Sequence, residues 1–204
     1  MTNSVSTITK KVYKIPDKLD DSLKIKEFLS RNKEKKVIVV QGLGFVGSVM
    51  SIVCANAVTE EYAVIGVDLP DKANYWKIQS INEGIFPIIA DDPKINLFFD
   101  KSKEKDNFFA TYDPIAYKYA DVIIVDINLD VEKRSSSNAV LKDFDVNLDS
   151  FKSAIKSIGR NCRNNVLVLV ETTVPPGTCE KIVKPIIEHE LSARGISIDK
   201  YRLG

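Results

Sequence analysis

The sequence predicts a doubly wound α/β domain with a parallel sheet, preceded by a short N-terminal helical extension. From residue 37 onward, short apolar runs alternate with helical segments, and a glycine-rich turn follows the first run. Strands that alternate with helices are joined by right-handed crossovers, which give a parallel sheet covered on both faces. The 204 residues are enough for one such domain, which buries about 70% of the surface of its unfolded chain.

Charge separates the chain into two parts. The first 36 residues carry ten Lys or Arg and five Asp or Glu, whereas the rest carry 19 and 23. We therefore expect a basic leader over 1–35 and the α/β domain over 36–204. The stretch from Asp20 to Arg31 is amphipathic and predicts one helix that packs on the flank of the domain. Four apolar residues of this helix are expected to face the domain: Leu23, Ile25, Phe28 and Leu29.

Each strand is predicted from a short apolar or β-branched run. Val37 to Val40 is bounded by charge and glycine, as expected of a strand buried on both faces. The remaining strands are predicted at 62–67, 108–111, 120–127, 166–170 and 201–203. Helices are predicted between them at 46–57, 72–82, 93–100, 113–119, 148–161 and 177–194. The turn-rich stretch 84–93 indicates a loop, and the polar stretch 128–146 indicates a mobile excursion.

Composition and charge exclude several classes of protein. A net charge of +1 gives no overall field that would attract nucleic acid or anionic lipid. Cys54, Cys162 and Cys179 lie far apart and are accompanied only by His189, so their spacing offers no metal site. The sequence has neither an apolar N-terminal stretch nor a run of about 18 apolar residues, the length of a membrane span. We therefore expect a cytoplasmic protein without metal, membrane or nucleic-acid partners.

The glycine-rich turn is a candidate cofactor site. Gly42, Gly44 and Gly47 form a G-x-G-x-x-G pattern directly between the first strand and the first helix. In such a turn the first glycine permits the tight bend, the second lets a pyrophosphate approach, and the third lets helix and strand pack closely. The phosphates then lie at the positive end of the helix.

Asp68 follows the second strand, 21 residues beyond Gly47. An acidic residue at this place accepts hydrogen bonds from the adenosine ribose hydroxyls and repels a 2′-phosphate. The combination predicts a Rossmann-type domain that binds NAD rather than NADP. The alternative is a glycine turn without a ligand, followed by a surface Asp. The sequence has no G-x-x-x-x-G-K-[S/T] loop for a nucleoside triphosphate and no Tyr-x-x-x-Lys pair of a short-chain dehydrogenase.

Five segments follow one another along the chain: Gly42-Leu-Gly-Phe-Val-Gly47, Gly66-Val-Asp68, Ile81-Asn-Glu-Gly-Ile-Phe-Pro-Ile88, Ala120-Asp-Val-Ile-Ile-Val125 and Val170-Glu-Thr-Thr-Val-Pro-Pro-Gly-Thr178. In this series the sequence resembles the N-terminal domain of the UDP-glucose/GDP-mannose dehydrogenase family, the nucleotide-sugar 6-dehydrogenases of polysaccharide biosynthesis. The resemblance covers about Lys36 to the end of the chain. It implies oxidation of the 6-hydroxyl of a UDP-sugar or another nucleotide sugar to a carboxylate, with two hydride transfers to NAD and a thiohemiacetal on a cysteine.

The resemblance also implies roles for single residues. The pyrophosphate is implied to lie against the glycine-rich turn, at Gly42, Leu43, Gly44, Phe45, Val46 and Gly47. Asp68 is implied to hold the adenosine ribose and Lys77 to lie near it, although a lysine on a solvated helix face is an equal alternative. Glu171 is the candidate catalytic residue, with a general acid or base role in handling water or protons. Thr172 and Thr173 are implied to form hydrogen bonds around the nicotinamide.

Two departures from the family pattern matter for function. Where family members follow the fourth strand with Thr-Pro, this chain has Asn128-Leu129-Asp130, and Leu129 carries no hydroxyl. The family's Gly-Gly-x-Cys-x-Pro-Lys-Asp segment, with its nucleophilic cysteine, does not occur in these residues, and none of the three cysteines has that context. We therefore expect the NAD-binding part of such an enzyme, cut off or separately encoded, that binds NAD without turning over a nucleotide sugar. The complete enzyme is expected to be a homo-oligomer.

Two other functions are compatible with the residues. The first is a non-catalytic NAD-binding or sensing module, with the leader and residues 128–146 as contact surfaces for a partner protein. Leu129 in place of the family threonine favours it slightly. The second is a complete enzyme of another NAD class, such as a hydroxyacid dehydrogenase, for which His189 is a poorly placed base because it lies well inside a helix.

Overall fold

The computed structural model describes residues 2–129, 131–135 and 141–204, with the backbone alone for 131–135 and 141–146. At its centre lies a six-stranded sheet in the order β10-β9-β6-β3-β4-β5, and every pairing within this sheet is parallel. The strands are β3 (Lys36–Gln41), β4 (Tyr62–Val67), β5 (Phe108–Thr111), β6 (Val122–Val125), β9 (Val166–Val170) and β10 (Tyr201–Leu203). This order is that of a Rossmann domain, and it confirms the predicted doubly wound fold.

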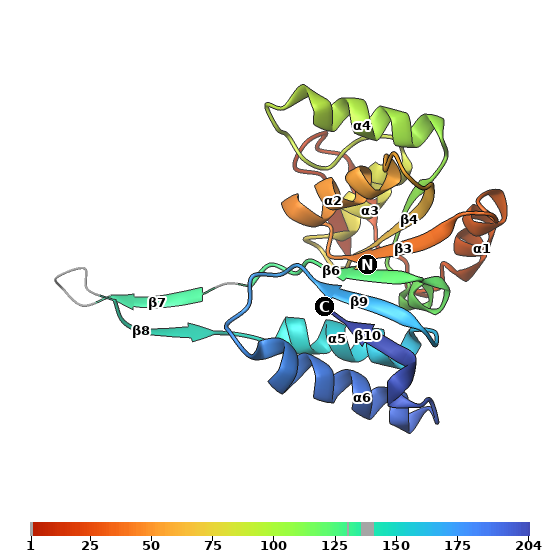
Figure 1. Cartoon of the computed structure of the whole chain (residues 1–204). Coiled ribbons are helices and arrows are strands. Elements are labelled where there is room, and N and C mark those ends of the chain that lie inside the picture. The colour runs from red at the N-terminus through yellow and green to blue at the C-terminus, as the bar shows by residue number, and fades with distance from the viewer. Residues whose placement is uncertain (1, 130, 136–140) are drawn as a thin grey trace.

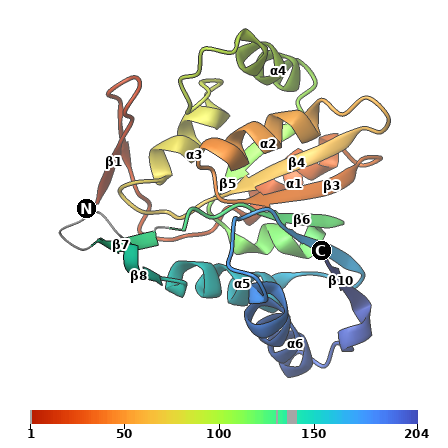
Figure 2. The same cartoon turned by 60° about the vertical axis from the view of Figure 1, so that its left-hand side comes forward.

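Helices cover both faces of the sheet (Figures 1 and 2). One face carries α2 (Phe45–Ala55), α3 (Tyr75–Asn82) and α4 (Pro93–Glu104). The other carries α5 (Asp149–Asn161), α6 (Lys184–Ala193) and the 3₁₀ helix η1 (Pro114–Tyr119). A π-helical turn η2 (Cys179–Val183) leads into α6, and a 3₁₀ turn η3 (Ile198–Lys200) leads into β10.

Alternate residues of the central strands face the two helical layers. Val39 and Ile123 pack with Ile155 of α5 in one apolar cluster, while Val40 packs with Ala55 of α2 in another. Both faces of these strands are therefore apolar, which explains why their sequences are continuously hydrophobic rather than alternating.

The order of the strands reverses at β3. The next sheet strand along the chain, β4, pairs on one side of β3, whereas β6 pairs on its other side. The loops that leave β3 and β6 therefore diverge at the carboxyl edge of the sheet. A crevice at such a switch point is where open α/β sheets bind their ligands.

The leader contains more than the predicted helix. An antiparallel hairpin of β1 (Asn3–Val5) and β2 (Val12–Lys14) precedes α1 (Ser22–Arg31). The hairpin was not predicted because its strands are three residues long and its turn lacks the usual glycine or Asn-Gly signal. Instead, Lys10 adopts the left-handed conformation, with φ of 63°.

Helix α1 packs against the domain through part of its predicted face. Ile25 and Phe28 are buried in the cluster that lies between the sheet and α5, and Leu29 packs against it. The expectation for Leu23 is wrong, because this side chain is 73% exposed. Leu23 stands in the first turn of α1 and does not pack against the apolar cluster that buries Ile25 and Phe28. The division of the chain at residue 35 stays a prediction.

The stretch 128–146 contains regular structure that its polar sequence did not predict. Strands β7 (Val131–Ser135) and β8 (Leu141–Val146) form an antiparallel hairpin. Figure 1 shows that this hairpin extends away from the rest of the chain. The centre of the predicted excursion, residues 136–140, lies outside the described residues.

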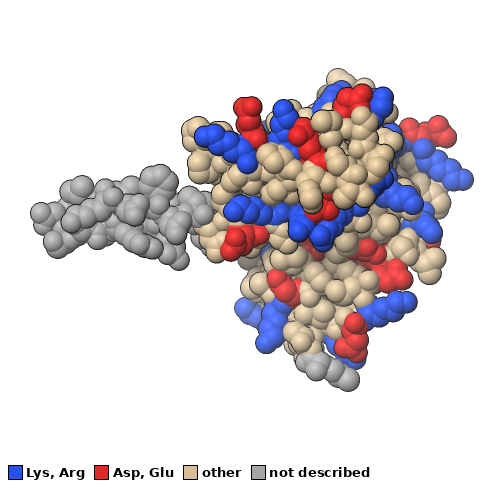
Figure 3. All heavy atoms as spheres, turned by 90° about the horizontal axis from the view of Figure 1, so that it is seen from below, with Lys and Arg blue, Asp and Glu red and all other residues tan. Residues whose placement is uncertain are grey.

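The surface carries both signs of charge. Figure 3 shows basic and acidic side chains interspersed over one face of the domain. Within the described part of the chain, no helix is long and apolar enough to cross a bilayer.

Candidate cofactor site

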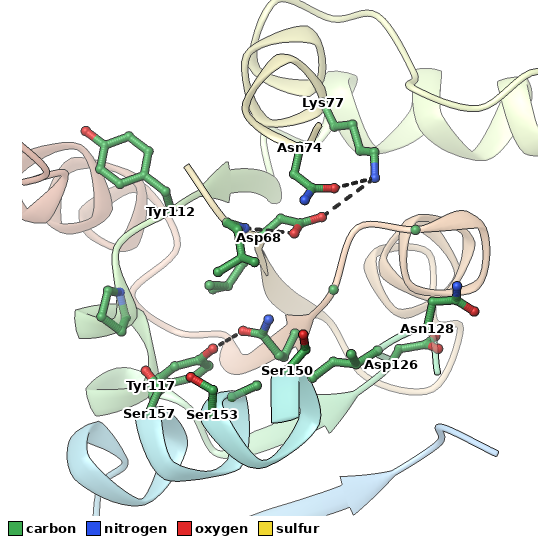
Figure 4. Close-up of a pocket in the computed structure, with 18 of the residues that line it drawn as sticks. Asp68, Asn74, Lys77, Tyr112, Tyr117, Asp126, Asn128, Ser150, Ser153 and Ser157 are labelled. Carbon is green, nitrogen blue, oxygen red and sulfur yellow. Dashed lines mark hydrogen bonds and ion pairs between the residues drawn. The ribbon is translucent and has the colours of Figure 1, made fainter. Parts of the chain in front are cut away.

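A pocket of about 630 Å³ opens at the carboxyl ends of β3, β4 and β6 (Figure 4). Both helical layers contribute to it, since α3 lies on one side of the sheet and α5 on the other. The residues that line it include Gln41, Gly42, Gly44, Asp68, Leu69, Asn74, Lys77, Tyr117, Asp126, Asn128, Asp149, Ser150, Ser153 and Ser157. The pocket therefore lies at the switch point of the sheet, where the topology predicts a ligand.

The three glycines of the turn meet different steric demands. Gly42 has φ of +98°, and a Cβ atom there would lie 2.2 Å from the backbone oxygen of Asp126. A Cβ atom on Gly47 would lie 1.9 Å from the backbone oxygen of Gly42, so α2 packs against the turn only with glycine at this place. Gly44 differs, because a Cβ atom there would meet nothing within 4 Å. The backbone at Gly44 is thus open to an approaching ligand.

The residues between the glycines use their backbone rather than their side chains. Leu43 is fully buried, with its methyl groups against Gly66. Phe45 and Val46 are exposed in the first turn of α2. The first N–H groups of a helix lack intrahelical partners, so this turn offers donors to an anion. The assignment of these residues to a pyrophosphate stays a prediction.

Asp68 is buried and joins two loops. Its Oδ2 accepts a hydrogen bond from the backbone N–H of Leu43 at 2.9 Å, and its Oδ1 accepts one from Leu69 at 2.7 Å. Burial raises the pKa of the Asp68 carboxyl, while the nearby charge of Lys77 and these two hydrogen bonds oppose the rise. The carboxylate therefore holds the glycine-rich turn against the loop that follows β4.

Lys77 reaches the pocket from α3. Its Nζ donates a hydrogen bond to Asn74 Oδ1 at 2.8 Å and lies 4.0 Å from Asp68 Oδ2. The side chain is only 18% exposed, which disagrees with the alternative of a lysine on a solvated helix face. Figure 4 shows Asp68, Asn74 and Lys77 together on one side of the pocket.

The opposite side of the pocket was not predicted from the sequence. Ser150, Ser153 and Ser157 of α5 line it, and their spacing places them on one helix face. The buried hydroxyl of Tyr117 donates a hydrogen bond to Gln41 Oε1, and burial raises the pKa of Tyr117 above its usual value. The serine spacing is a signal that was available in the sequence, whereas the pairing of Gln41 with Tyr117 depends on contacts between distant segments.

Glu171, Thr172 and Thr173 follow β9 beside the pocket rather than in its lining. Thr172 is structural, because its Oγ1 donates to the carbonyl oxygen of Val125 at 3.2 Å and accepts from the N–H of Ile127 at 2.9 Å. Glu171 and Thr173 are exposed, and the Glu171 N–H donates to the same Val125 oxygen at 2.9 Å. Neither Glu171 nor Thr173 lines the pocket, although the charge of Glu171 acts on Asp126, which does.

Asp126 follows β6 and lines the pocket next to the glycine-rich turn. Its Oδ2 is shielded from solvent and has no hydrogen-bond partner among the described residues. Burial and the charge of Glu171 raise the pKa of the Asp126 carboxyl. Sequence reasoning missed this residue, although an acidic residue directly after the fourth strand was visible.

The residues at which the sequence departs from the family pattern lie in the apolar core or pack against it. Leu129 is half-buried and packs against the main apolar cluster. Cys162 is buried, and burial raises the pKa of the half-buried Cys54 thiol to about 11. Cys54 is therefore protonated at neutral pH. Because the nucleophilic form of a cysteine is the thiolate, Cys54 is a poor nucleophile at that pH.

The sheet order, the glycine-rich turn at the start of α2 and the acidic residue after β4 together define a Rossmann-type dinucleotide-binding domain. Residues 35–201 match the model of the UDP-glucose/GDP-mannose dehydrogenase family, NAD binding domain. The chain belongs to this family, which confirms the resemblance and the prediction of NAD as cofactor.

Curated proteins with similar sequences are nucleotide-sugar dehydrogenases. The chain is 28% identical over 167 residues to a GDP-mannose 6-dehydrogenase of Pseudomonas putida, covering 79% of this chain and 34% of that protein. It is 26% identical over 147 residues to a UDP-N-acetyl-D-mannosamine dehydrogenase of Pyrococcus horikoshii, covering 72% of this chain and 31% of that protein. The chain thus spans about a third of the length of the curated relatives that it matches.

Solved structures show the same fold. An NDP-N-acetyl-D-galactosaminuronic acid dehydrogenase from Methanosarcina mazei superposes with a TM-score of 0.69 at 24% identity, over 88% of this chain and 36% of the other. A ternary complex of GDP-mannose dehydrogenase from Pseudomonas aeruginosa superposes with a TM-score of 0.62 at 26% identity, over 81% of this chain and 34% of the other.

Proposed function

We propose that this chain binds NAD in the pocket at the switch point and is the cofactor-binding part of a nucleotide-sugar 6-dehydrogenase. The observation that carries the proposal is the coincidence, in one pocket, of a glycine backbone open to a ligand with the paired side chains of Asp68 and Lys77. These residues fit a dinucleotide, because the turn offers N–H donors for phosphates and Asp68 keeps free lone pairs for ribose hydroxyls. Bound NAD would supply the hydride acceptor.

The residues proposed to contact the cofactor are those of the sequence prediction: Gly42, Leu43, Gly44, Phe45, Val46, Gly47, Asp68, Lys77 and Thr173. Thr173 is exposed and lies outside the pocket lining, so its contact would be made at the edge of the site. Glu171 is proposed to handle water or a proton in the sugar reaction. Its exposure beside the pocket suits a group that meets a substrate outside the cofactor site. A UDP- or GDP-sugar is the proposed substrate class, because the relatives' names include both. That the complete enzyme is a homo-oligomer stays a prediction.

Calorimetric titration with NAD and with NADP tests the cofactor proposal. We expect NAD to bind more tightly than NADP, because the Asp68 carboxylate accepts from ribose hydroxyls and repels a 2′-phosphate. Asp68→Ala should weaken NAD binding by about 1.5–3 kcal/mol, the contribution of a hydrogen bond to a charged group. Unchanged affinity in a folded Asp68→Ala protein would show that the ribose is held elsewhere, and no NAD binding by the folded wild type would refute the function.

The chain alone is proposed not to oxidise a sugar, because none of its cysteines lies in the family's nucleophile segment. Absorbance at 340 nm in the presence of NAD and UDP-glucose or GDP-mannose tests this point. Formation of NADH would contradict it.

A sensing module that binds NAD without catalysis is the second candidate. Leu129 favours it, since an apolar side chain packed on the core occupies the place of the family's threonine hydroxyl. Leu129→Thr in a chain that includes the family's cysteine segment separates the two functions. Activity that requires this substitution would favour the sensing module, and activity without it would favour the dehydrogenase.

A further inference from the structure

The pocket extends on both sides of Asp68. Figure 4 shows Asp126 on one side of this residue, and Tyr117, Ser153 and Ser157 on the other. Asp126 lies against the glycine-rich turn, where the proposed function puts the pyrophosphate. The opposite side has no part yet in the binding of a ligand. We call it the polar wall, and it consists of Gln41, Tyr117, Ser153 and Ser157.

Gln41 is a buried polar side chain of which one end is unused. It is the last residue of β3 and is only 7% exposed. Its Oε1 accepts the hydrogen bond of the Tyr117 hydroxyl, which has no other partner among the described residues. Its Nε2 has no hydrogen-bond partner in the described part of the chain and is not shielded from solvent. Because Tyr117 fixes the oxygen end of the amide, the N–H groups of Gln41 are oriented donors at the surface of the pocket.

The two serines add hydroxyl groups to the same wall. Ser153 is exposed and Ser157 is half-buried, and their spacing of four residues places them on one face of α5. Neither hydroxyl has a hydrogen-bond partner among the described residues, although serine hydroxyls in helices often bond to a backbone oxygen one turn earlier. A hydroxyl both donates and accepts, so each serine can bond to either kind of polar group on a ligand.

The position and the chemistry of the wall select one part of a dinucleotide. A nucleoside carries its phosphate and its base at opposite ends of the ribose. With the pyrophosphate at the turn and the adenosine ribose at Asp68, the adenine therefore lies on the side of the polar wall. The side chains of the wall are uncharged at neutral pH, which suits a neutral ring with nitrogen acceptors better than a phosphate, because phosphates favour charged donors. Leu69 and Pro114 line the same pocket and offer apolar surface to the faces of the ring.

We propose that the polar wall binds the adenosine half of the cofactor. The Nε2 of Gln41 donates a hydrogen bond to an acceptor atom of the adenosine, and the hydroxyls of Ser153 and Ser157 bond to the polar edge of the base. Tyr117 is a positioning residue, since it holds the oxygen of the Gln41 amide and thereby turns the nitrogen toward the ligand. The inference rests on the proposed function, because it requires a dinucleotide in the pocket.

Calorimetric titration with NAD and with ADP-ribose, which lacks the nicotinamide, tests the contact at Gln41. The variant combines Gln41→Met with Tyr117→Phe, because replacing both partners by apolar groups of similar shape leaves neither of them buried and unpaired. We expect it to bind both ligands about tenfold more weakly, the effect of losing one hydrogen bond. Tyr117→Phe alone keeps the donor but frees the amide to turn, so it should weaken binding only about twofold. Equal losses in the single and the combined variant would contradict the positioning role.

The hydroxyls are tested by Ser153→Ala combined with Ser157→Ala. This change does not endanger folding, because alanine favours a helix more than serine does. We expect both ligands to bind about three- to tenfold more weakly. Ser192→Ala is the matched control, since Ser192 is an exposed serine of the neighbouring helix α6 and lies outside the pocket lining. The control should bind both ligands as the wild type does.

The outcomes separate this inference from the proposed function. Unchanged NAD affinity in the combined Gln41 and Tyr117 variant would overturn the inference and leave the proposed function intact. Weaker binding of NAD but not of ADP-ribose would also overturn it, because the wall would then contact the nicotinamide half. If that variant does not fold, the pair of serine substitutions decides by the same two criteria. Absence of NAD binding by the folded wild type would refute the proposed function and, with it, the inference.

Discussion

The three glycines of the turn are not equivalent residues, although they belong to one motif. Gly47 is required by packing, because its Cα faces the backbone oxygen of Gly42 across a gap with no room for a methyl group. Gly44 faces open space and has φ of −70°, a conformation that other residues adopt readily. Folding therefore requires glycine at position 47, whereas the approach of a ligand depends on the open backbone at position 44.

A pair of substitutions tests this assignment. Gly47→Ala should destabilise the protein by about 1–3 kcal/mol, the usual cost of an inserted methyl group that forces the backbone to move. Gly44→Ala should leave the free energy of unfolding within about 0.5 kcal/mol but weaken NAD binding, because the methyl group points into open space at the ligand. Urea unfolding and calorimetry measure the two quantities. Equal loss of stability in both variants would contradict the assignment.

At the scale of elements, the N-terminal hairpin acts on α3. The buried hydroxyl of Ser4 accepts a hydrogen bond from the N–H of Trp76 at 3.0 Å and donates one to the carbonyl oxygen of Lys72 at 2.8 Å. It thus satisfies a first-turn N–H of α3 in the manner of an N-cap, while Asn74, the residue at the cap position, makes no such side-chain bond. Because α3 carries Lys77, the hairpin supports one side of the pocket.

Ser4→Ala should remove this support. We expect a loss of about 1 kcal/mol of stability, the usual cost of losing a cap, together with weaker NAD binding because the first turn of α3 loosens. Thermal unfolding and calorimetric titration measure the two effects. Ser30→Ala is the control, since its exposed hydroxyl bonds only to the carbonyl oxygen of Glu27 within α1. An equal effect of the control would show that the cap has no special role.

The elements that the sequence predicted well are those whose pattern is local. All six strands of the parallel sheet were predicted, and the central strands β3 and β4 show why: they are buried on both faces, so their sequences are continuous apolar runs such as Val37 to Val40. The hairpin of the leader was missed because its strands are short, and its place on α3 depends on residues some 70 positions away.

In the pocket, too, the residues of a local motif were predicted and the contacts between distant segments were not. Gly42, Gly44 and Asp68 were predicted to be near a ligand from motif spacing, and they do line one pocket. The unpaired carboxyl of Asp126 was missed, since whether a polar atom finds a partner is a property of the folded chain.

At the scale of the whole molecule, buried carboxyl groups influence how stability depends on pH. Burial raises the pKa of both Asp68 and Asp126 in the folded state. A folded state that holds protons more tightly than the unfolded state loses stability as the pH rises from about 3.9, the ordinary Asp value, through the folded-state pKa. Each of these groups therefore favours folding at acidic pH and opposes it near neutrality.

Asp126→Asn should reveal this contribution in the protein without cofactor. The amide cannot ionise, so the variant's stability relative to the wild type should increase as the pH rises from about 4 toward 7. Urea unfolding at a series of pH values measures the difference, in which the contributions of the exposed carboxyl groups cancel. A difference that decreases with pH would mean that folding favours the ionised form of Asp126.

The cap that Ser4 places on α3 also has a consequence for the order in which the molecule folds. The contact between Ser4 and Lys72 closes a loop of 68 positions, and such closure is entropically costly compared with the local contacts of a crossover unit. The sheet and its flanking helices can pack before this loop closes. In refolding experiments, recovery of cofactor binding should then lag behind recovery of secondary structure, because the support that the hairpin gives to α3 forms last.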